Sequence, residues 1–109
     1  MVYDKLVRDL VPKLYEKQGK TCLTEQLENE EYASYLIKAL DSEIFDFKKA
    51  FEGEDDELAV KKMADLVQVL YAILDLIGVE HSSFEKIRLA EVQKLGGYDN
   101  HILLKEVND

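Results

Sequence analysis

Residues 58–78, LAVKKMADLVQVLYAILDLIG, decide the fold. Large apolar residues recur in this stretch at spacings of three and four, which is the period of an α-helix with a buried face. Residues 32–51, YASYLIKALDSEIFDFKKAF, have the same period. Only a short acidic turn around Gly53 separates the two stretches, and we therefore expect them to form an antiparallel helical hairpin.

Carboxylates interrupt the apolar face of both predicted helices. Glu43 and Asp46 lie three positions apart in the first helix and therefore share one face. Asp65 lies among leucines and valines in the second, where an isolated charge is costly unless it is paired or bound to a cation. Facing carboxylates from two helices can hold magnesium. Lys62, one turn before Asp65, puts a positive charge where such a site needs a negative one.

Each of these residues also has a purely structural interpretation. Glu43 can pair with a lysine of its own helix, and Asp65 with Lys62. Lys5 and Arg8 belong to a basic patch near the start of the chain, which can grip phosphates or pair with nearby carboxylates. The residues alone leave both interpretations open.

Composition narrows the class of protein. The chain has 109 residues, of which 47% are hydrophobic, and one proline, which predicts a single, mostly helical domain over 1–109. A formal charge of −9 argues against nucleic-acid polymers and anionic membranes as partners. Cys22 is the only cysteine, and no signal peptide or membrane span is recognisable, so we expect a cytoplasmic protein. Helices this apolar predict a homodimer or homotetramer.

Shorter elements are expected on either side of the hairpin. A short helix is predicted after Asp9, and a third long helix after a capping box formed by Ser82 and Glu85. Segments 20–27 and 102–107 contain residues that favour extended chain, and they predict a small strand pair.

Four segments lie along nearly the whole length of the chain: YDKLVRDLVPKLYEKQGK (3–20), NEEYASYLIKALDSEIFDF (29–47), MADLVQVLYAILDLIGV (63–79) and LGGYDNHILL (95–104). Together they resemble the MazG-like, phosphoribosyl-ATP pyrophosphohydrolase-like proteins. The resemblance implies an all-α nucleoside-triphosphate pyrophosphohydrolase fold, a helix-hairpin bundle built as dimers or tetramers. It also implies magnesium-dependent cleavage of the α–β phosphate bond of a nucleotide, with release of pyrophosphate.

The departures from that family fall at its metal motif, ExxE followed after a spacer by ExxD. The first half corresponds to Glu43-Ile44-Phe45-Asp46, and the second to Lys62-Met63-Ala64-Asp65, with lysine in place of glutamate. A further acidic position of the family falls on Gln68, and two basic positions fall on Glu91 and Leu95. Exchanging a carboxylate for an ammonium changes the site charge by two units, each worth about 4 kcal/mol at ~4 Å and an effective dielectric of ~20. That change removes most of the affinity for magnesium.

The resemblance and its departures together predict binding of a nucleotide-like, phosphate-bearing ligand between helices, with hydrolysis weak or lost and no cofactor, in a protein that sequesters a nucleotide signal. The expected ligand contacts are Lys5, Arg8, Lys62, Asp65, Gln68, Glu43 and Asp46. The first alternative is an active magnesium-dependent pyrophosphohydrolase, in which Glu43, Asp46 and Asp65 hold the metal and Lys62 turns aside. The second is a helical protein-interaction module without a small ligand.

Overall fold

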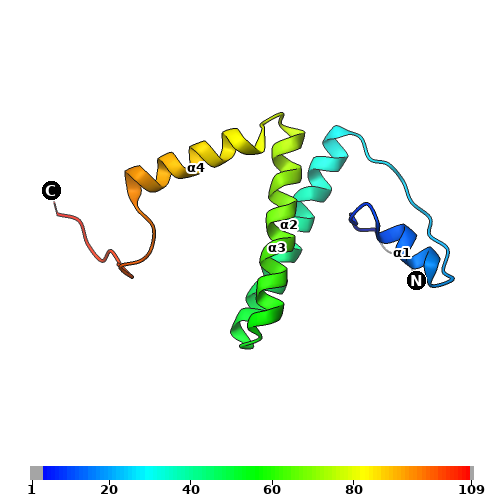
Figure 1. Ribbon diagram of the computed structural model, residues 1–109, viewed down its shortest axis with the longest axis horizontal. Helices are drawn as coiled ribbons and strands as arrows, with labels where there is room; N and C mark the ends of the chain where they lie inside the picture. The colour runs from blue at the N-terminus through cyan, green and yellow to red at the C-terminus, as the bar shows by residue number, and fades with distance from the viewer. Residues whose placement is uncertain (1–3, 109) are drawn as a thin grey trace. The chain divides into compact units, whose positions relative to one another are not determined.

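The computed structural model describes residues 4–108, and every regular element in that part of the chain is a helix (Figure 1). The elements are α1 (Val11–Lys17), α2 (Asn29–Glu52), α3 (Asp56–Leu76) and α4 (His81–Leu95). The predicted all-α class is therefore confirmed. The chain divides into two compact units, one ending at Gly78 and the other beginning at Val79. No helix within 4–108 has both the length and the apolar character needed to cross a bilayer.

Helices α2 and α3 form the predicted antiparallel hairpin and lie side by side (Figure 1). The turn between them is closed by Asp55, whose carboxylate accepts a hydrogen bond of 3.1 Å from the backbone N–H of Leu58 and so caps α3. The buried side chains of the hairpin are Leu36, Ala50, Ala59 and Leu74. The antiparallel order places the two alanines near the turn, where small side chains let the helices approach closely, and the two leucines toward the open end.

The predicted capping box at the start of α4 is wrong. The helix begins at His81 after Glu80, without a side-chain cap. Glu85 instead accepts hydrogen bonds from Arg88, one turn later, with 3.0 Å between Arg88 Nε and the nearer carboxylate oxygen. A carboxylate held toward the following turn cannot reach back to cap the helix start, so Ser82 has no partner for the box.

The predicted strand pair is also wrong within the described residues. Segments 20–27 and 102–107 have no regular secondary structure, and they belong to different units. A strand depends on backbone hydrogen bonds to a neighbouring strand, and neither segment is paired in this way. Their apolar side chains are largely exposed, for example Leu23 at 102% and Ile102 at 82%. Residues that favour extended chain do not make a strand without a partner.

The first unit begins with a short segment that leads into α1. Leu10 precedes the helix and Pro12 occupies its first turn, where a missing N–H breaks no hydrogen bond. The chain leaves the helix through Gly19 at φ 79°, a conformation that glycine adopts without strain. The helix predicted after Asp9 is therefore present, with its first residue at Val11.

The second unit contains α4 and the chain that follows it. None of its described side chains is buried, and only Val79 and Phe84 are partly covered. The remaining apolar residues of α4, including Ile87 at 58% and Leu95 at 72%, are exposed. A unit of this kind has no hydrophobic core of its own.

Candidate functional site

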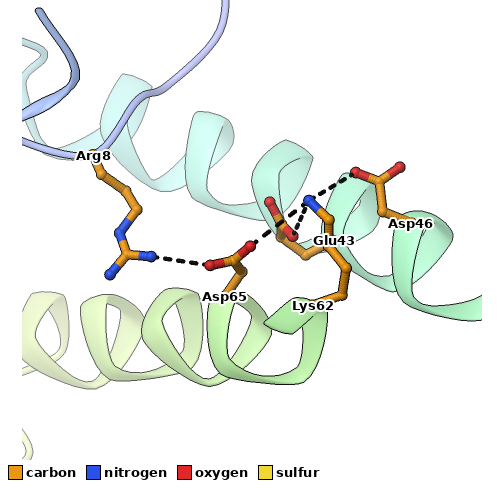
Figure 2. Close-up of polar contacts among 5 residues, drawn as sticks. All are labelled: Arg8, Glu43, Asp46, Lys62 and Asp65. Atoms are coloured by element: carbon orange, nitrogen blue, oxygen red, sulfur yellow. Dashed lines mark hydrogen bonds and ion pairs between the residues drawn. The ribbon is translucent and has the colours of Figure 1, made fainter. Parts of the chain in front are cut away.

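The polar faces of α2 and α3 meet at Lys62 (Figure 2). The Lys62 Nζ atom lies 3.7 Å from Oε2 of Glu43, 3.6 Å from Oδ2 of Asp46 and 3.7 Å from Oδ2 of Asp65. The first two carboxylates come from α2, and the third comes from the next turn of α3. Three carboxylates from two helices therefore converge on one cation. We call these four residues the Lys62 cluster.

The spacing of charged residues along each helix explains this arrangement. Glu43 and Asp46 lie three positions apart on α2, and Lys62 and Asp65 lie three positions apart on α3, so each pair shares a face. The antiparallel order sets Asp46 opposite Lys62 and Glu43 opposite Asp65. The two polar pairs therefore meet at the same height of the hairpin.

Arg8 reaches the cluster from the segment before α1 (Figure 2). Its Nη1 group donates a hydrogen bond of 3.0 Å to Oδ1 of Asp65, across 57 positions of sequence. Asp65 thus turns one oxygen toward Arg8 and the other toward Lys62. The Arg8 side chain is 66% exposed, and pairs as exposed as this contribute only about 0–1 kcal/mol. The contact therefore holds the N-terminal segment weakly.

Burial and charge act in opposite directions on Lys62. Burial is the largest single influence and lowers its pKa, but the carboxylates of Glu43, Asp46 and Asp65 together outweigh burial, so the pKa lies above the ordinary value of 10.5. Lys62 is consequently charged at neutral pH. Its distances of 3.6 Å to 3.7 Å to the three carboxylates are those of ion pairs, so charge holds the ammonium in place. Oε2 of Glu43 is inaccessible to water and has no hydrogen-bond partner in the described chain.

The raised pKa of Lys62 predicts a loss of stability at alkaline pH. A group whose pKa rises on folding stabilises the protein fully below its unfolded pKa, and this contribution is lost as the pH passes the folded pKa. The free energy of unfolding should therefore fall more steeply above about pH 10.5 in the wild type than in Lys62→Met. Urea unfolding followed at several alkaline pH values measures the two slopes, with Lys61→Met as the control. Equal slopes in wild type and Lys62→Met would contradict the assignment.

The cluster has the donor atoms of a magnesium site but not its charge. Its carboxylate oxygens are the hard donors that magnesium prefers, but an ammonium occupies their centre. Among residues 4–108, no group of three or more histidine, cysteine, aspartate or glutamate side chains has an arrangement that could hold a metal ion. Arranged around Lys62, the carboxylates of Glu43, Asp46 and Asp65 therefore do not fit this ion.

Two of the residues predicted to contact a ligand stay apart from the cluster. Lys5 and Gln68 are both exposed, and neither forms an ion pair or hydrogen bond with another described residue. Gln68 lies one turn beyond Asp65 on α3, whereas Lys5 lies in the segment before α1. The structure thus brings Arg8, Lys62 and the three carboxylates together, without Lys5 or Gln68.

A groove of about 370 Å³ opens beside the cluster at the turn end of the hairpin. Its lining residues are Asp46, Lys49, Ala50, Gly53, Asp55, Leu58 and Lys62. It is an open surface groove and not an enclosed cavity. Lys49 is absent from the predicted site. It follows Asp46 by three positions on α2, and this spacing is the sequence signal that would have found it.

Comparisons with known proteins leave the family open. No family model matches the chain, and neither a curated protein nor a solved structure matches it. The resemblance to MazG-like proteins therefore remains a prediction from the sequence.

Proposed function

We propose that the chain binds a nucleotide-like, phosphate-bearing ligand beside the Lys62 cluster and hydrolyses it weakly or not at all. The observation that carries the proposal is the Lys62 ammonium, 3.6 Å to 3.7 Å from three carboxylates of two helices. A divalent cation takes this place when helices hold a metal against a phosphate. Lys62 is a built-in cation there, and an ammonium can donate to a phosphate oxygen.

The same lysine explains why binding is proposed without efficient turnover. Metal-assisted hydrolysis depends on a bound water whose pKa the metal lowers, and an ammonium cannot supply this water. Because the pKa of Lys62 is raised, this residue is also a poor general base near neutral pH. The cluster carboxylates are held in ion pairs, Asp65 with both Lys62 and Arg8. Capture of the ligand, and hence sequestration of a nucleotide signal, is the role that these contacts support.

The other residues predicted to contact the ligand would touch it around Lys62 or beyond the cluster. Arg8 uses one N–H group toward Asp65 and keeps its other donors exposed, so it can reach a phosphate at the rim of the cluster. Glu43 and Asp46 can accept hydrogen bonds from sugar hydroxyls or base amino groups. Lys5 and Gln68 would touch only a ligand that extends beyond the cluster.

A nucleotide panel tests the proposal. Nucleoside mono-, di- and triphosphates are added in EDTA and, separately, in MgCl₂, and both the melting temperature and released pyrophosphate are measured. We expect at least one nucleotide to stabilise the protein in EDTA and to be recovered intact. At 100 times its Kd, such a ligand adds about 2.7 kcal/mol, or roughly 10 °C in Tm for a domain of this size.

Variants at two neighbouring lysines provide the control for this panel. Lys62→Met should weaken nucleotide binding by at least about tenfold, because it removes a charged donor, and Lys61→Met should not, because Lys61 lies outside the cluster. Multiple turnovers abolished by EDTA would replace the proposal with the magnesium-dependent pyrophosphohydrolase. If no nucleotide in the panel stabilises the protein, the helical protein-interaction module becomes the favoured function.

We also propose that the hairpin pairs with a second copy of the chain. On α3, residues Ala59, Leu66 and Ile73 recur every seven positions and are buried or partly covered. A second row of apolar residues, at spacings of three and four positions, lies beside them on the helix surface and remains exposed. We call this second row the outer row: Val60 at 59%, Met63 at 42%, Val67 at 42% and Leu70 at 39%.

A second hairpin is the occupant that suits the outer row. Residues spaced by three and four positions pack against another helix. In a four-helix bundle each helix contacts two neighbours, and a hairpin supplies only one of them. On α2, Ile37 and Phe51 are also exposed, at 53% and 63%. Two copies related by a two-fold axis would cover both helices, which makes a homodimer the proposed assembly and a homotetramer the other outcome of the same measurement.

A further inference from the structure

The groove beside the Lys62 cluster contains a second lysine, Lys49, whose ammonium has no ion-pair partner among the described residues. Four of the lining residues are charged: Asp46, Lys49, Asp55 and Lys62. Asp46 pairs with Lys62 at 3.6 Å, and Asp55 accepts the backbone hydrogen bond that caps α3. Lys49 forms no ion pair or hydrogen bond with another described residue. An anion in the groove would therefore meet one unpaired ammonium and the accessible side of another.

The other sides of Lys62 are unfavourable for an anion. Glu43 and Asp65 flank the ammonium there, and both carboxylates would repel a phosphate. Arg8 lies beyond Asp65 and is already bound to it. The groove also has two carboxylates, Asp46 and Asp55, but there the unpaired Lys49 ammonium lies beside Lys62, and Ala50 and Leu58 form apolar walls. The groove is thus the better approach to Lys62 for a negatively charged group.

We infer that the groove binds the terminal phosphoryl group of the ligand between Lys49 and Lys62, and that Lys49 is a ligand-binding residue. This inference rests on the proposed function and specifies the ligand class. A phosphate monoester carries about 1.5 to 2 negative charges at pH 7. A phosphodiester carries one. Beside the Asp46–Lys62 pair, Lys49 adds an unpaired ammonium to the groove, which favours the more highly charged monoester, so the ligand is a linear nucleotide with a terminal phosphate and not a cyclic one.

Paired lysine variants test the position of the phosphate. Lys49→Gln removes the second ammonium, and Lys48→Gln removes the same charge from an adjacent exposed residue that does not line the groove. Binding of the 5′-monophosphates and 3′,5′-cyclic monophosphates of adenosine, guanosine, cytidine and uridine is measured by calorimetry in EDTA. We expect Lys49→Gln to weaken binding of the best linear nucleotide by about tenfold or more, and Lys48→Gln by less than about twofold.

Comparing the linear and cyclic forms tests the ligand class. The wild type should bind the linear nucleotide at least about tenfold more tightly than its cyclic counterpart, and Lys49→Gln should reduce this preference. Equal effects of the two lysine variants, with Lys62→Met still weakening binding, would overturn the inference and leave the proposed function standing. Equal or tighter binding of the cyclic form would also overturn it. If no nucleotide binds the wild type, the proposed function fails and the inference fails with it.

Discussion

Replacing Lys62 by glutamate is expected to make the stability of the protein depend on magnesium. The wild-type site has Lys62 and Arg8 against three carboxylates, and the variant has Arg8 against four. At about 4 Å and an effective dielectric of ~20, each unit charge interacts with its neighbour by about 4 kcal/mol. The carboxylates are 24% to 45% exposed, so solvent screening reduces this figure. We expect a loss of about 2–4 kcal/mol in EDTA, much of it recovered with millimolar magnesium.

Lys61→Glu is the matched control for that experiment. It makes the same change of two charge units at the adjacent position of α3, but on an exposed side chain outside the cluster. Its unfolding free energy should change by less than about 1 kcal/mol and should not respond to magnesium. Urea unfolding of both variants in EDTA and in MgCl₂ gives the comparison. Equal stability of the two variants, with no magnesium response from either, would refute the idea that Lys62 occupies a cation position.

The second large effect is expected at the outer row of α3. In one chain Val67 is 42% exposed, and in the proposed homodimer it would be buried between two hairpins. Val67→Lys would place an unpaired ammonium at that interface, which costs several kcal/mol. Each 1.4 kcal/mol is a factor of ten in affinity, so the dimer Kd should rise by at least about 100-fold. Light scattering after size exclusion should show the mass falling to that of one chain.

The Lys61→Glu variant also serves as the control for assembly. Lys61, Gln68 and Asp75 recur every seven positions and form a polar stripe on α3, apart from the outer row. A charge change on this stripe should leave the mass unchanged. The assembly proposal would be abandoned if the wild type has the mass of one chain at micromolar concentration. It would also be abandoned if folded Val67→Lys keeps the wild-type mass.

Much of the fold was predictable because its signals are local. The apolar period of three and four specified the two long helices, and the acidic turn between them specified the hairpin. Asp55, which caps α3, belongs to this acidic turn. The failures share a cause. The Ser82 capping box does not form, because Glu85 pairs with Arg88. Segments 20–27 and 102–107 do not form strands, because neither pairs with a neighbouring strand. Both features depend on which partner a group finds.

Some contacts of the candidate site could likewise be predicted from the sequence, and others could not. The sequence singled out Glu43, Asp46, Lys62 and Asp65 because charges stand out in an apolar helical face. The structural interpretation of Glu43, a pair with a lysine of its own helix, is wrong, since Glu43 pairs with Lys62 of α3. The pairing of Asp65 with Lys62 is confirmed. That pair is one part of a three-carboxylate cluster.

The order of residues is enough to specify a helical chain, a hairpin of its two longest helices, and charged residues within the apolar faces. These properties follow from the 3.6-residue period and from the length of the turn, which act within a few positions. The contacts between elements become visible in the folded chain alone: three carboxylates share Lys62, Arg8 reaches Asp65, and Lys49 lines a groove beside them. The physical reason is register: contacts between helices depend on how far one is shifted along the other, and packing across the whole hairpin sets that shift.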